Sequence, residues 1–195
     1  MPYFSSRDIA AIAMCATLWG ILNSIFAPIF FSISHLPFFC DMIGFSVLVL
    51  AAWWIRKIGA ITIIGVIATL INFAIAPNPY HFLGFTAAST FFDLTTAASG
   101  YGRTFRRKTY TAASMMAISV FSASLAGFII GTFFMTGAAF NAMGGVLGWA
   151  GLHAIGGVIG GAIGTSLVTG LDARKITAKN STMQQPQPNF IRDSE

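Results

Sequence analysis

The Lys and Arg residues of this chain fall into short clusters that are separated by long apolar stretches. The eleven residues are Arg7, Arg56, Lys57, Arg103, Arg106, Arg107, Lys108, Arg174, Lys175, Lys179 and Arg192. Each stretch between neighbouring clusters is long enough for two crossings of a hydrocarbon core of about 30 Å. The chain therefore returns to the same side of a membrane each time, and the positive-inside bias identifies that side as the cytoplasm.

The composition excludes an ordinary soluble domain. The 195-residue chain is 55% hydrophobic and only 9% charged, whereas soluble proteins average roughly 25% charged residues. Its net charge of +5 does not indicate nucleic-acid binding, because the basic residues flank apolar runs instead of sharing one folded face. These charges are interpreted as topology signals, with contact to anionic lipid headgroups as an additional role.

Apolar runs of about 20 residues predict an all-α, polytopic membrane protein, a bundle of six transmembrane helices with both termini in the cytoplasm. The expected spans are about 6–27, 36–55, 59–76, 80–100, 109–135 and 142–171. They form one transmembrane domain at 1–176. Residues 177–195, rich in Gln, Pro and Asn, are expected to be a disordered cytoplasmic tail. The pattern places the protein in the plasma membrane.

Several local signals set the ends of these spans. Ser5 and Asp8 have the spacing of a capping box at the start of the first helix. Pro28 is expected to end that helix, so that residues 30–35 form an outer loop or re-entrant piece. Residues 77–79 (Pro-Asn-Pro) predict a tight outer turn, and the reversal between the last two spans is expected near 137–141.

Polar side chains within the spans collect toward the outer side. Counted at about 1.5 Å per helical residue from Arg56, Asp41 lies roughly 22 Å from the inner edge. Aromatic residues are interleaved with these polar groups, which is the composition of a small-molecule pocket. The candidate substrate-binding residues are Asn23, His35, Asp41, Asn72, His81, Trp149 and His153. Singly, the interfacial His residues and the Asn residues are equally compatible with structural roles at helix ends.

Asp93 has a different position. The same rise, counted from Arg103, places it roughly at mid-membrane. A structural role is the simpler interpretation, either in pairing with Arg103 or in holding helices together. An ion site is the alternative.

The chain contains no HExxH motif, GxSxG motif or pair of carboxylates at helical spacing. The sequence therefore predicts no enzyme, no metal site and no cofactor.

Small residues form stripes on two of the predicted helices. The last span carries overlapping GxxxG pairs between Gly156 and Gly164, and the first span carries Ala13, Ala16 and Gly20. Such stripes let helix backbones approach closely. They fit either packing inside the bundle or a docking face for a partner subunit.

Four segments resemble the substrate-binding S components of energy-coupling factor (ECF) vitamin transporters. They are Ser-Ser-Arg-Asp-Ile-Ala at 5–10, Leu-Pro-Phe-Phe-Cys-Asp at 36–41, His-Phe-Leu-Gly-Phe at 81–85 and the glycine-rich 151–174. The resemblance covers roughly residues 5–175. It implies docking of Ala13, Ala16 and Gly20 on a membrane-embedded T component, although a strict Ala-x-x-x-Ala is absent from the first helix.

The resemblance also implies a function: capture of a vitamin or small heterocyclic precursor in an outward-facing pocket of an ECF-type ABC importer. Two cytoplasmic ATPase subunits would complete the complex, in keeping with the absence of a nucleotide-binding GxxxxGK[ST] motif here. One alternative is a self-sufficient small secondary transporter or channel that acts as an oligomer, with Asp93 as its ion site. A structural or assembly protein is a further alternative.

Overall fold

The computed structural model describes residues 3–76 and 80–176, and every regular element in this part of the chain is a helix. The predicted turn at 77–79 and the predicted tail at 177–195 lie outside the described residues. The helices are α1 (Ser6–Ser34), α2 (Phe38–Ile55), α3 (Ala60–Ile75), α4 (Phe82–Ser99), α5 (Tyr101–Thr104), α6 (Lys108–Phe133), α7 (Ala138–Ala142) and α8 (Gly145–Ala173).

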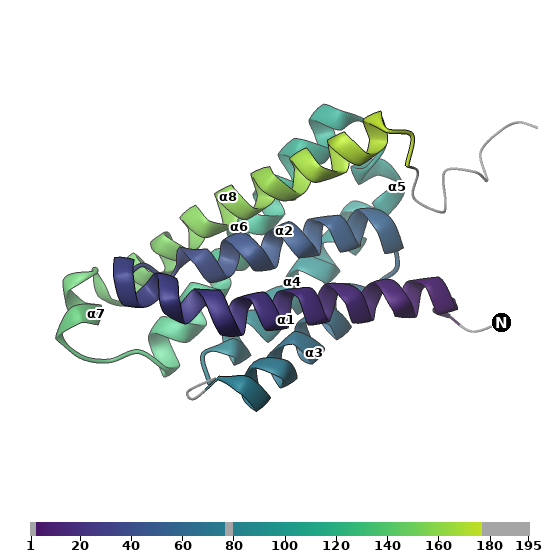
Figure 1. Cartoon of the computed structure of the whole chain (residues 1–195). Helices are drawn as coiled ribbons and strands as arrows, with labels where there is room; N and C mark the ends of the chain where they lie inside the picture. Colours follow the sequence, from purple (N-terminus) through teal and green to yellow (C-terminus); the bar gives the residue numbers. More distant parts are fainter. Residues whose placement is uncertain (1–2, 77–79, 177–195) are drawn as a thin grey trace, which may run out of the picture.

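The six longer helices pack in a closed ring (Figure 1). Going round it, α1 contacts α3, α3 contacts α4, α4 contacts α6, α6 contacts α8, α8 contacts α2, and α2 returns to α1. Helix α2 leans toward the middle, because it also touches α3, α4 and α6. Its buried residues include the continuous run 44–49, as expected of a helix that is apolar all round and central in its bundle.

Four of these helices are long and apolar enough to cross a membrane, namely α1, α2, α6 and α8. Helix α3 is apolar but has only 16 residues, about 24 Å at the usual rise. Helix α4 has 18 residues and contains Asp93 together with several Ser and Thr residues. The fold therefore supports a helical membrane protein.

Helix α1 begins as predicted and ends later than predicted. The Ser5 hydroxyl accepts from the Asp8 N–H, and the Asp8 carboxylate accepts from the Ser5 N–H, which makes a complete capping box. Pro28 does not end the helix, which continues to Ser34. The prediction of an outer loop at 30–35 is therefore wrong. In lipid, a continuous helix satisfies the hydrogen bonds of most backbone groups, so the N–H group that Pro28 lacks is tolerated.

The two ends of the helix bundle differ in charge. Figure 1 shows the start of α1, helix α5 and the end of α8 at one end, and α7 at the other. The basic residues of the described part lie at the first of these ends, because they occupy the start of α1, the α2–α3 connection, α5 with the start of α6, and the end of α8. We call this the basic end, and the opposite one the α7 end.

Helix α8 fits between its neighbours through two glycine faces. A Cβ atom at Gly160 would lie 2.8 Å from the carbonyl oxygen of Asp41 in α2. One at Gly157 would lie 2.7 Å from the carbonyl oxygen of Ser119 in α6. The glycine stripe of α8 therefore packs inside the bundle, because only glycine lets both backbones approach this closely.

Candidate functional site

A cavity of about 300 Å³ opens near the α7 end of the bundle. All six ring helices contribute to it, since its walls come from the C-terminal halves of α1, α3 and α6 and from the N-terminal halves of α2, α4 and α8 or the residues next to them. Its lining residues are Asn23, Ser24, Ala27, Pro28, Phe31, Leu36, Pro37, Phe39, Cys40, Asn72, Ala76, His81, Phe82, Phe85, Ile130, Met135, Trp149 and His153. The wall is thus mainly apolar with a few polar groups, which is typical of small-molecule sites.

An acid–imidazole pair stands at the wall of this cavity. Nδ1 of His153 in α8 lies 2.7 Å from Oδ2 of Asp41 in α2, and both side chains are buried. His153 lines the cavity, whereas Asp41 lies behind it. The two groups form a close polar contact but no hydrogen bond, because both imidazole nitrogens of His153 and both carboxylate oxygens of Asp41 have no hydrogen-bond partner among the described residues.

Glycines make room for this pair. A Cβ atom at Gly127 of α6 would lie 2.8 Å from Cβ of His153, and one at Gly156 would lie 2.6 Å from Cβ of Asp41. Both glycines are buried. The close approach of α8 to α2 and α6 at this level therefore depends on them, and it brings the carboxylate and the imidazole together.

Two further lining residues carry buried polar atoms without a hydrogen-bond partner in the described part of the chain. They are the indole N–H of Trp149 and both side-chain amide atoms of Asn23. The thiol of Cys40, a weak hydrogen-bonding group, lies beside the Asn23 amide. Buried groups of this kind are destabilising unless a partner satisfies them, so they are the atoms most available to a ligand.

Asn72 differs from Asn23, although both line the cavity. Its Oδ1 accepts a hydrogen bond of 2.7 Å from the Ser24 hydroxyl, and its Nδ2 donates to the carbonyl oxygen of Ala68 at 2.8 Å. The bond from Ser24 joins α1 to α3, and the two bonds together hold the Asn72 side chain in one position. Its contribution to the site is therefore a fixed polar surface.

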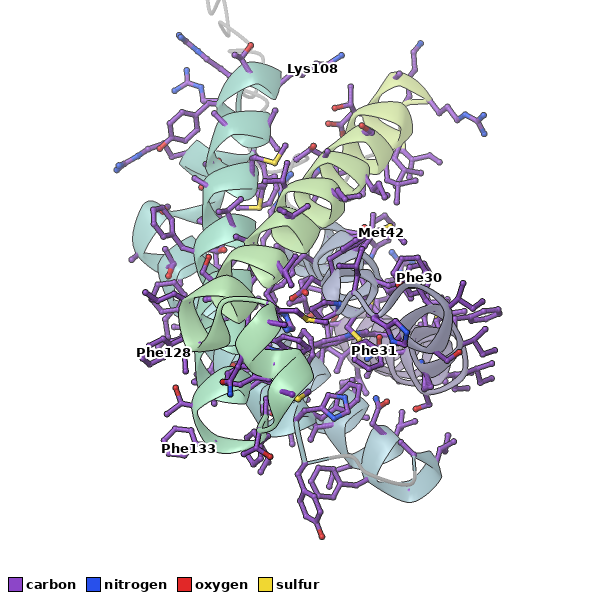
Figure 2. The ribbon with its side chains drawn as sticks, turned by 90° about the vertical axis from the view of Figure 1, so that its left-hand side faces the viewer. Phe30, Phe31, Met42, Lys108, Phe128 and Phe133 are labelled. Carbon is purple, nitrogen blue, oxygen red and sulfur yellow. The ribbon has the colours of Figure 1, made fainter. Side chains whose placement is uncertain are left out.

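Aromatic rings surround the polar groups. The ring of Trp149 lies 5.8 Å from that of His153 and 6.4 Å from that of Phe31, and Phe85 lies 5.8 Å from His153 on another side. Figure 2 turns the α7 end toward the reader, with Phe31 on the α1 side of the bundle, and Phe128 and Phe133 pointing outward from α6 on the other. A flat ligand can therefore stack against several rings within this cavity.

Of the seven residues predicted to bind substrate, five line the cavity: Asn23, Asn72, His81, Trp149 and His153. Asp41 reaches it only through His153. His35 is exposed as the left-handed C-cap of α1 and does not line the cavity.

The residues predicted to dock a partner are divided between two environments. Ala16 and Gly20 are buried, and a Cβ atom at Gly20 would lie 2.9 Å from Ile71 of α3. Ala13 is exposed. Two of the three residues are therefore used in packing α1 within the bundle.

The sequence interpretation missed several lining residues, above all Ser24, Phe31 and Phe85. Ser24 and Phe31 share a helical face with Asn23 and Ala27, at the spacing of successive turns. Phe31 was missed because the first helix was expected to end at Pro28, whereas Ser24 lay within the expected helix and was not singled out. A continuous helix would have placed Phe31 beside the candidate residues.

Asp93, which was expected at mid-membrane, lies closer to the basic end of the bundle than the helical rise from Arg103 suggested. Its Oδ2 accepts hydrogen bonds from the N–H groups of Gly59 and Thr62 and from the Thr62 hydroxyl, and its Oδ1 accepts from the Tyr101 hydroxyl. It therefore caps the start of α3 beside the basic end. Burial and the adjacent carboxylate raise the pKa of Tyr101 above its ordinary value, which keeps this hydroxyl a donor. The estimate from Arg103 failed because α4 stops at Ser99 and the chain turns.

Comparisons with protein-family models, with curated proteins and with solved structures find no match to this chain.

Proposed function

We propose that this protein is a membrane-embedded binding subunit that captures a small organic solute, in the manner of an ECF-type S component. The observation that carries the proposal is the cavity of about 300 Å³ at the α7 end, with aromatic walls and buried polar groups that lack partners. This volume is at the lower end of the range of about 300–1,000 Å³ for ligand sites.

The proposed arrangement has six spans and both termini in the cytoplasm of a plasma-membrane protein. The basic end then faces inward by the positive-inside bias, and the cavity opens toward the outside. The short α3 contacts both α1 and α4, and as a helix it satisfies its backbone groups within the segment. A T component and two ATPase subunits would supply the remaining functions of an importer.

The alternative, a self-sufficient oligomeric transporter, depends on Asp93 as an ion site. Both carboxylate oxygens of Asp93 accept hydrogen bonds from its own chain, which favours a structural role. Liposomes that contain only this chain test the alternative directly. Solute flux driven by a proton gradient and lost in Asp93→Asn would favour it, whereas the binding subunit gives no flux.

The test of the proposal is binding by the isolated protein. The full chain, purified into nanodiscs, is titrated calorimetrically with a panel of water-soluble vitamins and their ring precursors, and any solute retained through purification is identified by mass spectrometry. We expect one solute to bind with a Kd in the nanomolar to micromolar range. The absence of binding across the panel, of a retained solute and of a co-purifying T component would refute the proposal.

A further inference from the structure

The volume of the cavity limits the size of its ligand. A cavity of 150 Å³ lined by apolar side chains holds one benzene molecule, and this one has about 300 Å³. The ligand that fills it therefore has on the order of a dozen non-hydrogen atoms by the same proportion. One or two fused rings fit this size and fill the cavity.

The charges around the cavity select against an anion. Among the residues described, no Lys or Arg lines it, and the basic residues lie at the opposite end of the bundle. Any positive charge on His153 is already matched by Asp41 at 2.7 Å. His81 is half-buried, with its ring 4.6 Å from that of Phe82. A carboxylate or phosphate that enters this cavity would lose its hydration shell. Because no cation in the wall compensates for that loss, binding of an anion is strongly unfavourable.

The atoms without partners define the polar edge of the ligand. The indole N–H of Trp149 can only donate, so it requires an acceptor. The Asn23 amide offers one acceptor and one donor side by side. A ring nitrogen or carbonyl oxygen next to an N–H group satisfies this amide, and such an edge is characteristic of aminopyrimidines, pyridine carboxamides, lactam rings and pterins.

We infer that the solute is a heteroaromatic compound of one or two rings without an anionic group, held between aromatic walls with its acceptor-bearing edge toward Trp149, His153 and Asn23. This inference rests on the proposed function and names the class of solute that the site takes. The flat faces stack on the phenylalanine and tryptophan rings, and the edge supplies the hydrogen bonds that the buried groups lack.

Matched pairs of probes test the inference. Three uncharged rings are each compared with a carboxylate of the same ring: nicotinamide with nicotinate, uracil with orotate, and pterin with pterin-6-carboxylate. Titrations use the full chain in nanodiscs of zwitterionic lipid, so that the bilayer surface does not repel the anions. If a compound of the wider vitamin panel binds instead, it is compared with its own carboxylate or phosphate ester.

We expect the uncharged member of at least one pair to bind and its anionic partner to bind at least 100-fold more weakly. Trp149→Phe should weaken the binding of that ligand about 10-fold, whereas Trp54→Phe, a change at an exposed ring near the basic end, should not. An anion that binds as tightly as its uncharged partner, or a ligand larger than two rings, overturns the inference and leaves the proposed function intact. If no compound of either set binds, no solute is retained through purification and no T component co-purifies, the proposed function fails and the inference fails with it.

Discussion

Nδ1 of His153 and Oδ2 of Asp41 lie 2.7 Å apart, and their side chains are 2% and 0% exposed. The pair joins α8 to α2 at the level of the cavity, and Gly127 and Gly156 leave the space that it occupies. The contact therefore connects two helices of the ring at a residue, His153, that lines the cavity.

The first prediction concerns this pair. Removal of one partner leaves the other buried without its counterpart, so Asp41→Asn and His153→Gln should each lower the free energy of unfolding by about 3–5 kcal/mol. The double variant should be more stable than the sum of the two losses predicts, with a coupling energy of about 1–3 kcal/mol. Unfolding in SDS, followed by circular dichroism, measures these values.

A matched histidine provides the control for that experiment. His35 is exposed and has a left-handed backbone conformation with φ of 58°, which Asn also accepts. His35→Asn should therefore change the unfolding free energy by less than about 0.5 kcal/mol. Strictly additive effects of Asp41→Asn and His153→Gln would show that the contact does not couple the two helices.

The second prediction concerns the indole of Trp149. Trp149→Phe keeps an aromatic ring in the wall but removes a buried N–H that lacks a partner. Since a hydrogen bond contributes about 0.5–1.5 kcal/mol, we expect ligand affinity to fall up to about 10-fold while the unfolding temperature stays the same or rises. Calorimetric titration and thermal unfolding of the same preparation separate these effects. Unchanged affinity would show that the indole N–H does not reach the ligand.

Much of the helical arrangement could be predicted from the sequence, because apolar run length and basic flanks are local signals. Helices α2, α3, α4 and α6 begin and end within two residues of the expected spans. The glycine stripe of α8 likewise predicted close packing, and both of its faces are buried in the bundle. The error at Pro28 came from a rule for water-exposed helices, where a broken helix can satisfy its backbone with solvent.

The candidate site was less accessible to sequence reasoning, because it depends on which helices are neighbours. Polarity within an apolar run identified Asn23, Asn72 and His153 as candidates, and all three line the cavity. The contact of His153 with Asp41 could not be foreseen, since it requires α8 to lie against α2. Phe85 was missed for a similar reason: an apolar residue in an apolar helix gives no signal of its own.

The third prediction concerns Asp93. Its carboxylate accepts hydrogen bonds from the first turn of α3 at Oδ2 and from the Tyr101 hydroxyl at Oδ1, and Asn would place its NH2 group against one of these two sets of donors. Asp93→Asn should therefore lower the free energy of unfolding by about 1–3 kcal/mol. Ligand affinity, measured below the unfolding transition, should be unchanged because Asp93 lies away from the cavity. A variant with normal stability but altered binding would contradict this assignment.

The fourth prediction concerns orientation. Thr136 is exposed near the α7 end and Arg106 is exposed at the basic end, so cysteines at these positions report the two sides of the membrane. In a background with Cys15→Ala and Cys40→Ala, a membrane-impermeant maleimide should label Thr136→Cys in intact cells. Arg106→Cys should react only after permeabilisation, and a permeant maleimide should label both. The reverse pattern would place the cavity on the cytoplasmic side.

The last prediction separates two kinds of glycine in α8. A Cβ atom at Gly160 would lie 2.8 Å from the carbonyl oxygen of Asp41, whereas one at Gly170 would meet nothing within 4 Å. Gly160→Ala should therefore force α8 away from α2 and lower the free energy of unfolding by about 1–3 kcal/mol. Gly170→Ala should raise the free energy of unfolding by up to about 1 kcal/mol, because alanine is the better helix former.

The same two variants should also differ in ligand binding. Since movement of α8 displaces His153 from Asp41, Gly160→Ala should weaken ligand binding and Gly170→Ala should not. Thermal unfolding and calorimetric titration of both variants in nanodiscs check this, and equal stability of the two would mean that α8 and α2 are not packed through glycine.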